Sequence, residues 1–404
     1  MLDLTHPAIT WQPTWQCDLE EASKNNPSFS QLADLISSVN KSTQGSSGET
    51  PTARKVAMFL QQLPVGVFAK VCTRAQMTPE GWMQQILLGE HLRAAYKGAL
   101  FGKSATWQDP GLPVTIFSTT NARTQQSAFA LMAGLLPGIR HQDGSRVQVV
   151  RGVNFCRGIS CNCPAVNKLL RIKDKASSRR QKYDASLAEV RLEIEEVLIP
   201  MTTKEERKRV VPGISAIQEL FLTSLCHNVT LPCGPTECIT PDLVERLLQH
   251  TDAMAEDLRA NTTDGPHVRY ARMDMQPLLS EIAKDMQVTS SRQGHNPPHF
   301  TLYSGHDITV SPLIDALGIP SHRVPSFASR VVFELWTDRF MQNYVRILYN
   351  GRDQIKNVRF CRGRVNKDGL CPLQYFASFV KQDNMQYFNI ESYAEACQLN
   401  FKDK

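Results

Sequence analysis

Two segments of the chain place a short apolar, β-branched run directly before a helical pattern of apolar residues. Residues 113–118 and 299–304 are runs of this kind, and each predicts a strand. The segments that follow, residues 120–136 and 308–317, carry apolar residues at helical spacing and predict helices. A strand that leads through a tight polar turn into a helix is the repeating unit of α/β folds, so we expect an α/β sheet domain.

Residues 156–290, between these two units, are helical in pattern and contain no convincing strand. Three apolar patterns of helical spacing predict helices at residues 180–198, 215–225 and 240–258. A Thr-Pro-Glu sequence at residues 78–80 predicts a further helix start. Near the end of the chain, two alternating runs predict an antiparallel strand pair at the end of the sheet. We therefore expect an α/β domain of residues 1–150 and 295–404, with an α-rich cap of residues 151–294 inserted.

Composition narrows the class of protein. The 404 residues, 42% apolar and 21% charged, indicate two or three globular domains. The formal charge of +6 is too small and too dispersed to indicate a nucleic-acid partner. The chain has no window of 18 consecutive apolar residues, so we expect no membrane-spanning helix in it. No signal peptide is visible at its start.

The eleven cysteines favour an oxidising compartment, and their odd number leaves at least one thiol without an internal partner. Several lie in polar stretches with proline or glycine, which is typical of disulfides. Zinc is the alternative at residues 156–163 and 226–238, but neither stretch has paired Cys-x2-Cys knuckles, so disulfides are preferred. Sequence spacing assigns no pairing. Sequons at Asn40, Asn228 and Asn261 support a secretory route only weakly, because such triplets also arise by chance.

Polar residues suited to a phosphate follow both predicted strands. His306 and Asp307 lie where the second strand ends and its helix begins. Ligands of open α/β sheets bind outside the carboxyl ends of the strands, and a helix N-terminus there favours an anion. The histidine can donate to that anion, the aspartic acid can supply a proton, and Arg123 after the first strand suits a phosphate equally. Taken singly, each has a plainer interpretation: Asp307 as a helix N-cap, His306 as a surface residue and Arg123 as a solvated side chain.

Longer stretches of the chain carry a resemblance to a known family. They are FCRGISCNCP (155–164), LCHNVTLPC (225–233), SRVVFELW (329–336), RILYNG (346–351), Cys361 and CPL (371–373). Together with LYSGHD (302–307) and the Arg123 turn, they resemble the histidine acid phosphatases, and most closely the group that acts on 2-phosphoxylose. The resemblance runs from about Cys17 to Cys397 and implies a three-layer, histidine phosphatase-like sheet domain with an inserted α-helical cap.

The resemblance also implies a mechanism through a phosphohistidine. A histidine in an Arg-His-Gly-x-Arg motif attacks phosphorus, Arg123 and His306 hold the phosphoryl oxygens, and Asp307 protonates the leaving oxygen. None of the ten histidines lies in Arg-His-Gly, and the nearest similar sequence, at Arg140 and His141, lacks the glycine. We expect the nucleophile, the first strand and a membrane anchor to lie upstream of the first residue. We also expect the chain as given to hydrolyse little phosphomonoester.

The expected activity is that of a phosphoric monoester hydrolase. We expect the enzyme to remove the 2-phosphate of xylose in the glycosaminoglycan–protein linkage region, in the Golgi lumen. The expected partner is the phosphorylated glycan linker, and we expect no nucleic acid, cofactor or metal. The alternatives are a non-catalytic pseudo-phosphatase and a phosphatase of inositol phosphates or lysophosphatidic acid. The basic run from Lys168 to Lys182 fits an anionic glycan, although a solvated helix face explains most such runs.

Overall fold

The structure is a computed structural model of the 404-residue chain. It describes residues 76–101, 113–136, 147–151, 163–175, 180–200, 203, 211, 213–259, 265–291, 299–321, 323–383 and 392–399. Two compact units divide the chain. The first takes Met1–Val153, Ala188–Leu247 and Pro297–Ser304, and the second takes Asn154–Leu187, Leu248–Asn296 and Gly305–Lys404. The predicted division into an α/β domain and a cap stays a prediction.

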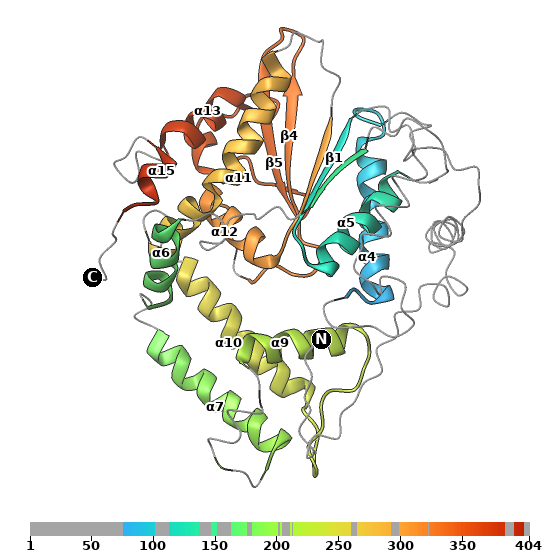
Figure 1. Ribbon diagram of the computed structural model, residues 1–404, viewed down its shortest axis with the longest axis vertical. Helices are drawn as coiled ribbons and strands as arrows, with labels where there is room; N and C mark the ends of the chain where they lie inside the picture. Colours follow the sequence, from blue (N-terminus) through green and yellow to red (C-terminus); the bar gives the residue numbers. More distant parts are fainter. Residues whose placement is uncertain are drawn as a thin grey trace, which may run out of the picture. The chain divides into compact units, whose positions relative to one another are not determined.

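The first unit contains a three-stranded parallel sheet. Strands β1 (Val114–Ser118), β2 (Val147–Arg151) and β3 (Phe300–Ser304) lie in the order β2-β1-β3 (Figure 1). At the carboxyl ends of β1 and β3, Ser118 of β1 is paired with Ser304 of β3. The predictions of β1 and β3 are confirmed, whereas the sequence pattern did not predict β2.

Helices α4 (Pro79–Tyr96) and α5 (Ala122–Leu135) pack against each other, and α5 packs against the strands. The predicted helix start is confirmed, because Thr78 caps α4 by accepting the N–H of Gly81 at 3.3 Å. The largest buried side chains of this core are Trp82, Phe101, Ile116, Phe129, Met132 and Leu135. Burial of side chains of this size contributes about 1.5–3 kcal/mol each.

Two glycines bring α4 and α5 into backbone contact. A Cβ atom on Gly89 would lie 2.0 Å from the carbonyl oxygen of Leu131, and one on Gly134 would lie 2.0 Å from the carbonyl oxygen of Ile86. Both distances are well inside van der Waals contact, so a side chain fits at neither position without moving a helix. The glycine pair therefore sets the distance between α4 and α5.

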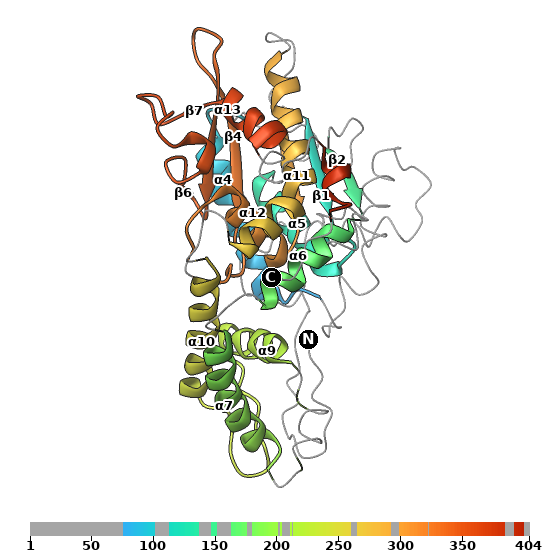
Figure 2. The same ribbon diagram turned by 90° about the vertical axis from the view of Figure 1, so that its left-hand side faces the viewer.

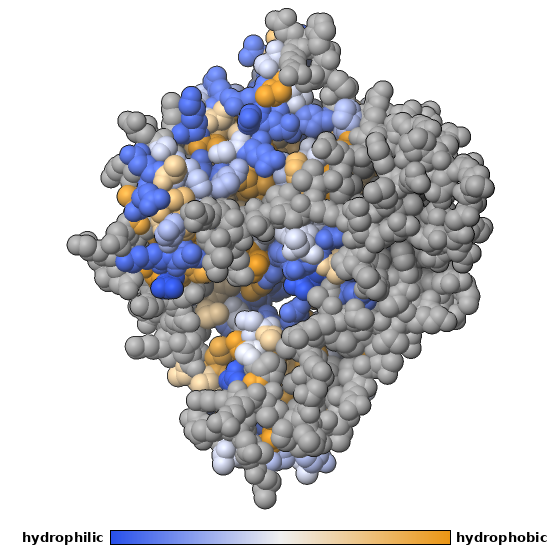
Figure 3. All heavy atoms as spheres, viewed as in Figure 1, coloured by the Kyte–Doolittle hydropathy of each residue, from blue (hydrophilic) through white to orange (hydrophobic). Residues whose placement is uncertain are grey.

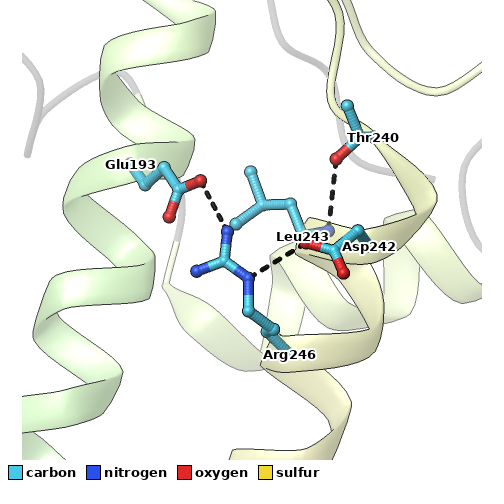
Figure 4. A network of polar contacts seen from close by, with 5 residues as sticks. All are labelled: Glu193, Thr240, Asp242, Leu243 and Arg246. Carbon is cyan, nitrogen blue, oxygen red and sulfur yellow. Dashed lines mark hydrogen bonds and ion pairs between the residues drawn. The ribbon is translucent and has the colours of Figure 1, made fainter.

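Helices α7 (Arg180–Leu198) and α10 (Pro241–Arg259) lie side by side (Figures 1 and 2). Within the first unit, Arg246 donates to Glu193 on α7 at 2.5 Å and to Asp242, one helical turn earlier, at 3.3 Å (Figure 4). Its hydrogen bond to Glu193 raises the pKa of the guanidinium. The side chains are largely solvent-exposed, so this network orients the helices more than it stabilises them.

The predicted helices of the middle segment are confirmed. Besides α7 and α10, they include α9 (Ile214–Cys226), which lies between those two in the sequence. At the start of α10, Thr240 accepts the N–H of Leu243 at 3.2 Å, which is the N-cap that its Thr-Pro-Asp sequence favours (Figure 4). Among the described residues of 156–290, strand-like pairing is limited to a single bridge between Cys233 and Cys238.

The second unit combines helices with a separate antiparallel sheet. Its helices are α6 (Pro164–Lys175), α11 (Pro266–Ser291), α12 (Asp307–Leu317), α13 (Leu373–Ser378) and α15 (Tyr393–Ala396), with short helical turns at Arg359–Cys361 and Phe379–Asp383. Its strands are β4 (Val331–Thr337), β5 (Asn343–Tyr349), β6 (Arg352–Asp353) and β7 (Cys371–Pro372). Hydrophilic residues gather on the face of α11 and β4 that Figure 3 presents.

The pairing of β4 and β5 confirms one expectation. The two strands are antiparallel, as predicted. Their ladder continues to β6 and β7 and, among the described residues, shares no hydrogen-bonded strand with the β2-β1-β3 sheet. The expectation that they form the end of that sheet stays a prediction. The alternating pattern fixed their mutual pairing, but it carries no information about which sheet they join.

Three disulfides confirm the preferred interpretation of the cysteines. They join Cys163 to Cys397, Cys233 to Cys238 and Cys361 to Cys371. Among the described cysteines, Cys226 is free and exposed. Cys17, Cys72, Cys156 and Cys161 lie outside the described residues. The zinc alternative at residues 226–238 therefore loses Cys233 and Cys238 to a disulfide.

Candidate active site

The carboxyl ends of β1 and β3 lie side by side, and each strand leads through a short turn into a helix. Ser118 and Ser304, the last residues of the two strands, are buried, and the N–H of Thr119 donates to the Ser304 carbonyl at 3.4 Å. The first turn ends at Asn121, the N-cap of α5, and the second at His306, the N-cap of α12. The first N–H groups of a helix lack partners within it, so each turn ends in a group suited to an anion.

The turn that carries Arg123 is held by hydroxyl and amide groups. Thr124 Oγ1 donates to the carbonyl of Asn121 at 2.8 Å and lies 2.7 Å from Thr119 Oγ1. Gln125 Nε2 donates to the carbonyl of Thr119 at 3.4 Å. Arg123 is the second residue of α5 and is exposed. The network fixes the backbone from which Arg123 projects, while its guanidinium stays accessible to a ligand.

Ser304 and Gln125 are residues of this turn region that sequence reasoning missed. The Ser304 hydroxyl donates to the carbonyl of Thr124 at 2.7 Å and so ties the end of β3 to the first turn of α5. Gln125 is 7% exposed, and its Oε1 has no hydrogen-bond partner among the described residues. The available signal was the density of hydroxyl and amide side chains around the two strand ends, at Ser118, Thr119, Thr120, Thr124, Gln125 and Ser304.

His306 and Asp307 begin α12. His306 is half-buried at the N-cap position, and its backbone N–H donates to Thr309 Oγ1 at 3.4 Å. Asp307 is the first helical residue and is exposed. The alternative interpretation, with Asp307 as the N-cap, is therefore wrong, because His306 occupies that position. The Asp307 carboxyl is left facing solvent at the start of the helix, where a ligand can reach it.

A partly buried ion pair anchors α12 within the second unit. Arg259 donates through Nε to Asp315 Oδ1 at 2.7 Å and through Nη2 to Ser311 Oγ at 2.5 Å. The side chains of Arg259 and Asp315 are only 12% and 11% exposed. Gly318 ends the helix in the left-handed conformation, with φ of 78°. These contacts hold in place the helix whose first turn contains Asp307. Sequence reasoning did not anticipate the contacts of Arg259.

The sequence-predicted residues thus follow neighbouring strand ends. Arg123 comes after β1, and His306 and Asp307 come after β3. That their side chains hold one phosphate between them stays a prediction. Arg140 and His141 lie outside the described residues. In the described part of the chain, no cluster of three histidine, cysteine or carboxylate side chains is placed to hold a metal ion, and no helix is both long and apolar enough to cross a membrane.

Comparison with known proteins identifies the family. The profile of the histidine phosphatase superfamily (branch 2) matches residues 22–213 and 241–350. The 2-phosphoxylose phosphatase 1 of Danio rerio is 32% identical over 96% of this chain and 77% of its own length. That of Xenopus tropicalis is 31% identical over 96% of this chain and 73% of its own.

A solved structure supports the fold. The apo form of Hafnia alvei phytase superimposes with a TM-score of 0.55 at 18% identity, over 81% of this chain and 90% of the phytase. The α/β fold class with its helical segments, expected from the strand–turn–helix units, is thereby confirmed. The profile match covers more than half of the chain, and the chain belongs to branch 2 of the histidine phosphatase superfamily.

Proposed function

We propose that the carboxyl ends of β1 and β3 bind the phosphate of a phosphomonoester and are the place where a phosphatase of this family cleaves it. The observation that carries this proposal is the pairing of Ser118 with Ser304 at the ends of β1 and β3. Because these residues are neighbours, the two turns that follow them begin at the same edge of the sheet, and each turn leads to a helix N-terminus that favours an anion. A phosphate spreads its charge over three oxygens and needs several donors at once. Arg123, the free N–H groups of two helix starts and His306 supply donors of this kind.

The proposed roles follow from the chemistry of each side chain. Arg123 and His306 bind the phosphoryl oxygens, and Asp307 donates its proton to the ester oxygen as the P–O bond breaks. That proton converts an unfavourable alkoxide leaving group into a neutral alcohol. The family resemblance assigns the acceptor of the phosphoryl group to a histidine in an Arg-His-Gly sequence, which these 404 residues lack. Where that histidine is present, it would take the phosphoryl group, and water would then hydrolyse the phosphohistidine. The exposed positions of Arg123 and Asp307 support these roles.

The proposed substrate is 2-phosphoxylose in the linkage region between a glycosaminoglycan and its protein. The relatives named 2-phosphoxylose phosphatase 1, which align with 96% of this chain, support that substrate. Their names and the three disulfides also support an oxidising, secretory location, for which we propose the Golgi lumen. The proposed partner is the phosphorylated glycan linker.

Binding and turnover need separate tests, because no histidine of the 404 residues lies in Arg-His-Gly. Loss of a covalent nucleophile lowers kcat by about 10^5–10^6. We therefore expect the chain to bind the phosphorylated linker while releasing phosphate at or near the uncatalysed rate. Robust phosphate release that Asp307→Asn abolishes would show that the chain holds a nucleophile of another kind.

The binding test uses calorimetry with a linker tetrasaccharide that carries 2-phosphoxylose. We expect binding that weakens about 10-fold or more in Arg123→Ala, because one charge-assisted pair is lost. Arg362→Ala, which removes another exposed arginine, is the matched control and should bind as the unchanged chain does. Equal binding of the unphosphorylated tetrasaccharide, or no loss in Arg123→Ala, contradicts the proposal. Tighter binding of inositol hexakisphosphate or lysophosphatidic acid would keep the site and change the substrate.

A further inference from the structure

Helix α9 ends in a turn whose geometry singles out Asn228. The N–H of Asn228 donates to the carbonyl of Leu225 at 3.2 Å, and the N–H of Val229 donates to the carbonyl of Ser224 at 2.9 Å. This pair of bonds is the Schellman motif, which places one residue in the left-handed region. Asn228 occupies that position with φ of 51°. The chain reverses there, so Asn228 lies at the tip of a turn.

The turn is tied down by the residue before Asn228. His227 Nδ1 donates to the carbonyl of Thr223 at 2.8 Å, which leaves Nε2 to accept from the hydroxyl of Thr78 at the start of α4. Asn228 itself is exposed, and the structure records no side-chain hydrogen bond for it within the described residues. The backbone of the turn is therefore fixed, while the side-chain amide of Asn228 faces solvent.

Asn228, Val229 and Thr230 form an N-glycosylation sequon, and Thr230 is exposed as well. The middle residue is not proline, which the modification requires. The disulfide between Cys233 and Cys238 follows a few residues later in the same first unit and indicates an oxidising compartment. Of the three sequons, Asn228 is the one that the described residues include.

We propose that Asn228 carries an N-linked glycan. The Nδ2 atom of Asn228 attacks the anomeric carbon of a lipid-pyrophosphate-linked oligosaccharide, an N–C bond forms, and the C–O bond to pyrophosphate breaks. The lipid pyrophosphate is the leaving group, and the amide loses one proton to the base of the transferase. Because the side chain lies at an exposed turn tip, a bulky glycan fits there without displacing packed residues.

A helix-capping role explains the same asparagine without a glycan, because asparagine is favoured at left-handed C-terminal positions of helices. The two explanations separate by substitution. Asn228→Gly keeps the left-handed conformation, which glycine adopts without strain, and removes the glycan acceptor. Thr230→Ala keeps the capping asparagine and destroys the sequon. Thr230→Ser keeps both.

The test expresses the full chain behind a secretory leader in eukaryotic cells and examines the secreted protein by mass spectrometry. Trypsin releases residues 210–246 as one peptide, in which Asn228 is the only asparagine and Cys226, Cys233 and Cys238 are the cysteines. Removal of the glycan by peptide N-glycosidase in 18O-water converts Asn228 to labelled aspartate. The same peptide shows whether Cys233 and Cys238 are joined by a disulfide. The disulfide is therefore an internal control that the molecule has passed through an oxidising compartment.

We expect the label at Asn228 in the unchanged chain and in Thr230→Ser, and its absence from Thr230→Ala and Asn228→Gly. A secreted peptide with oxidised Cys233 and Cys238 but an unmodified Asn228 overturns the proposal. Glycans at Asn40 or Asn261 do not affect the outcome, because neither lies in this peptide. Thermal unfolding of Asn228→Gly beside Thr230→Ala, which keeps the asparagine without a glycan, then measures the capping contribution separately.

Discussion

Ser304, the last residue of β3, donates its hydroxyl to the carbonyl oxygen of Thr124 in the first turn of α5, at 2.7 Å. Ser304→Ala leaves that buried carbonyl without this donor, and we expect the free energy of unfolding to fall by about 1–3 kcal/mol. Ser321→Ala is the matched control, because its hydroxyl also bonds a backbone carbonyl but in an exposed position. Urea unfolding at pH 7 measures both variants. An equal loss of unfolding free energy in both would mean that the buried Ser304 hydrogen bond stabilises the fold no more than the exposed one.

The contact between Gly89 and the backbone of α5 predicts a large effect from a small change. Gly89→Ala or Gly134→Ala places a methyl group against a carbonyl oxygen, and we expect each to cost about 3 kcal/mol or more of unfolding free energy. Gly98→Ala is the control, since a Cβ there meets nothing within 4 Å and should change stability by no more than about 0.5 kcal/mol. Chemical denaturation of the three variants measures these unfolding free energies. Comparable losses in all three would contradict close contact between the backbones of α4 and α5.

Two ion pairs of the molecule differ in burial and therefore in expected strength. Arg259→Met removes the arginine partner of the largely buried Asp315, and we expect a loss of about 3 kcal/mol because a carboxylate is left without its counter-charge. Arg246→Met removes an exposed pair, and we expect the urea midpoint to stay within experimental error. A larger loss in Arg246→Met than in Arg259→Met would reverse this ranking.

The β4–β5 hairpin carries a pH-sensitive contact at Asp338. The backbone N–H groups of Gln342 and Phe340 and the hydroxyl of Tyr344 donate to its carboxylate and lower the pKa of Asp338. The folded chain thus holds this proton less tightly than the unfolded chain. The stabilisation is complete above the ordinary aspartate pKa of about 4 and is lost as pH falls through the lower folded value.

The test of this contact compares urea midpoints at several pH values. We expect the unchanged chain to exceed Asp338→Ala at pH 7, and the gap to narrow as pH falls below about 4. Asp338→Asn keeps an acceptor oxygen without the charge and should lose most of this pH dependence. A gap that is the same at pH 3 and pH 7 would contradict a role for the carboxylate charge.

The strand–turn–helix units were predictable because several local signals agree there. β-Branched runs mark β1 and β3, and polar turns and apolar helical spacing mark α5 and α12. Two of the elements that escaped prediction show the physical reasons. β2 spans only five residues, too few for its pattern of apolar and polar positions to be decisive, although the polar sequence of residues 142–145 precedes it. The 26-residue α11 contains Pro277 and many polar side chains, a pattern that favours a break in a helix over its continuation.

The candidate site divided in the same way. The two turns and their charged residues could be located, because ligand sites of α/β sheets lie beyond strand ends. The contacts that hold those turns could not, since Ser304 and Thr124 are 180 residues apart in sequence. Arg259 and Asp315 meet through tertiary packing that no local spacing encodes. Disulfide pairing is of the same kind, because sequence spacing alone left every connectivity open.

The disulfide between Cys163 and Cys397 has a consequence for how the molecule responds to proteolysis. It joins residues 234 apart in sequence, and both sulfur-bearing residues are buried. A protease that cuts one peptide bond between them releases no fragment, because the two pieces remain linked until a thiol reduces the bridge. A nicked chain therefore runs at its full mass on a non-reducing gel and falls apart only after reduction, so redox conditions decide whether a backbone break separates the chain.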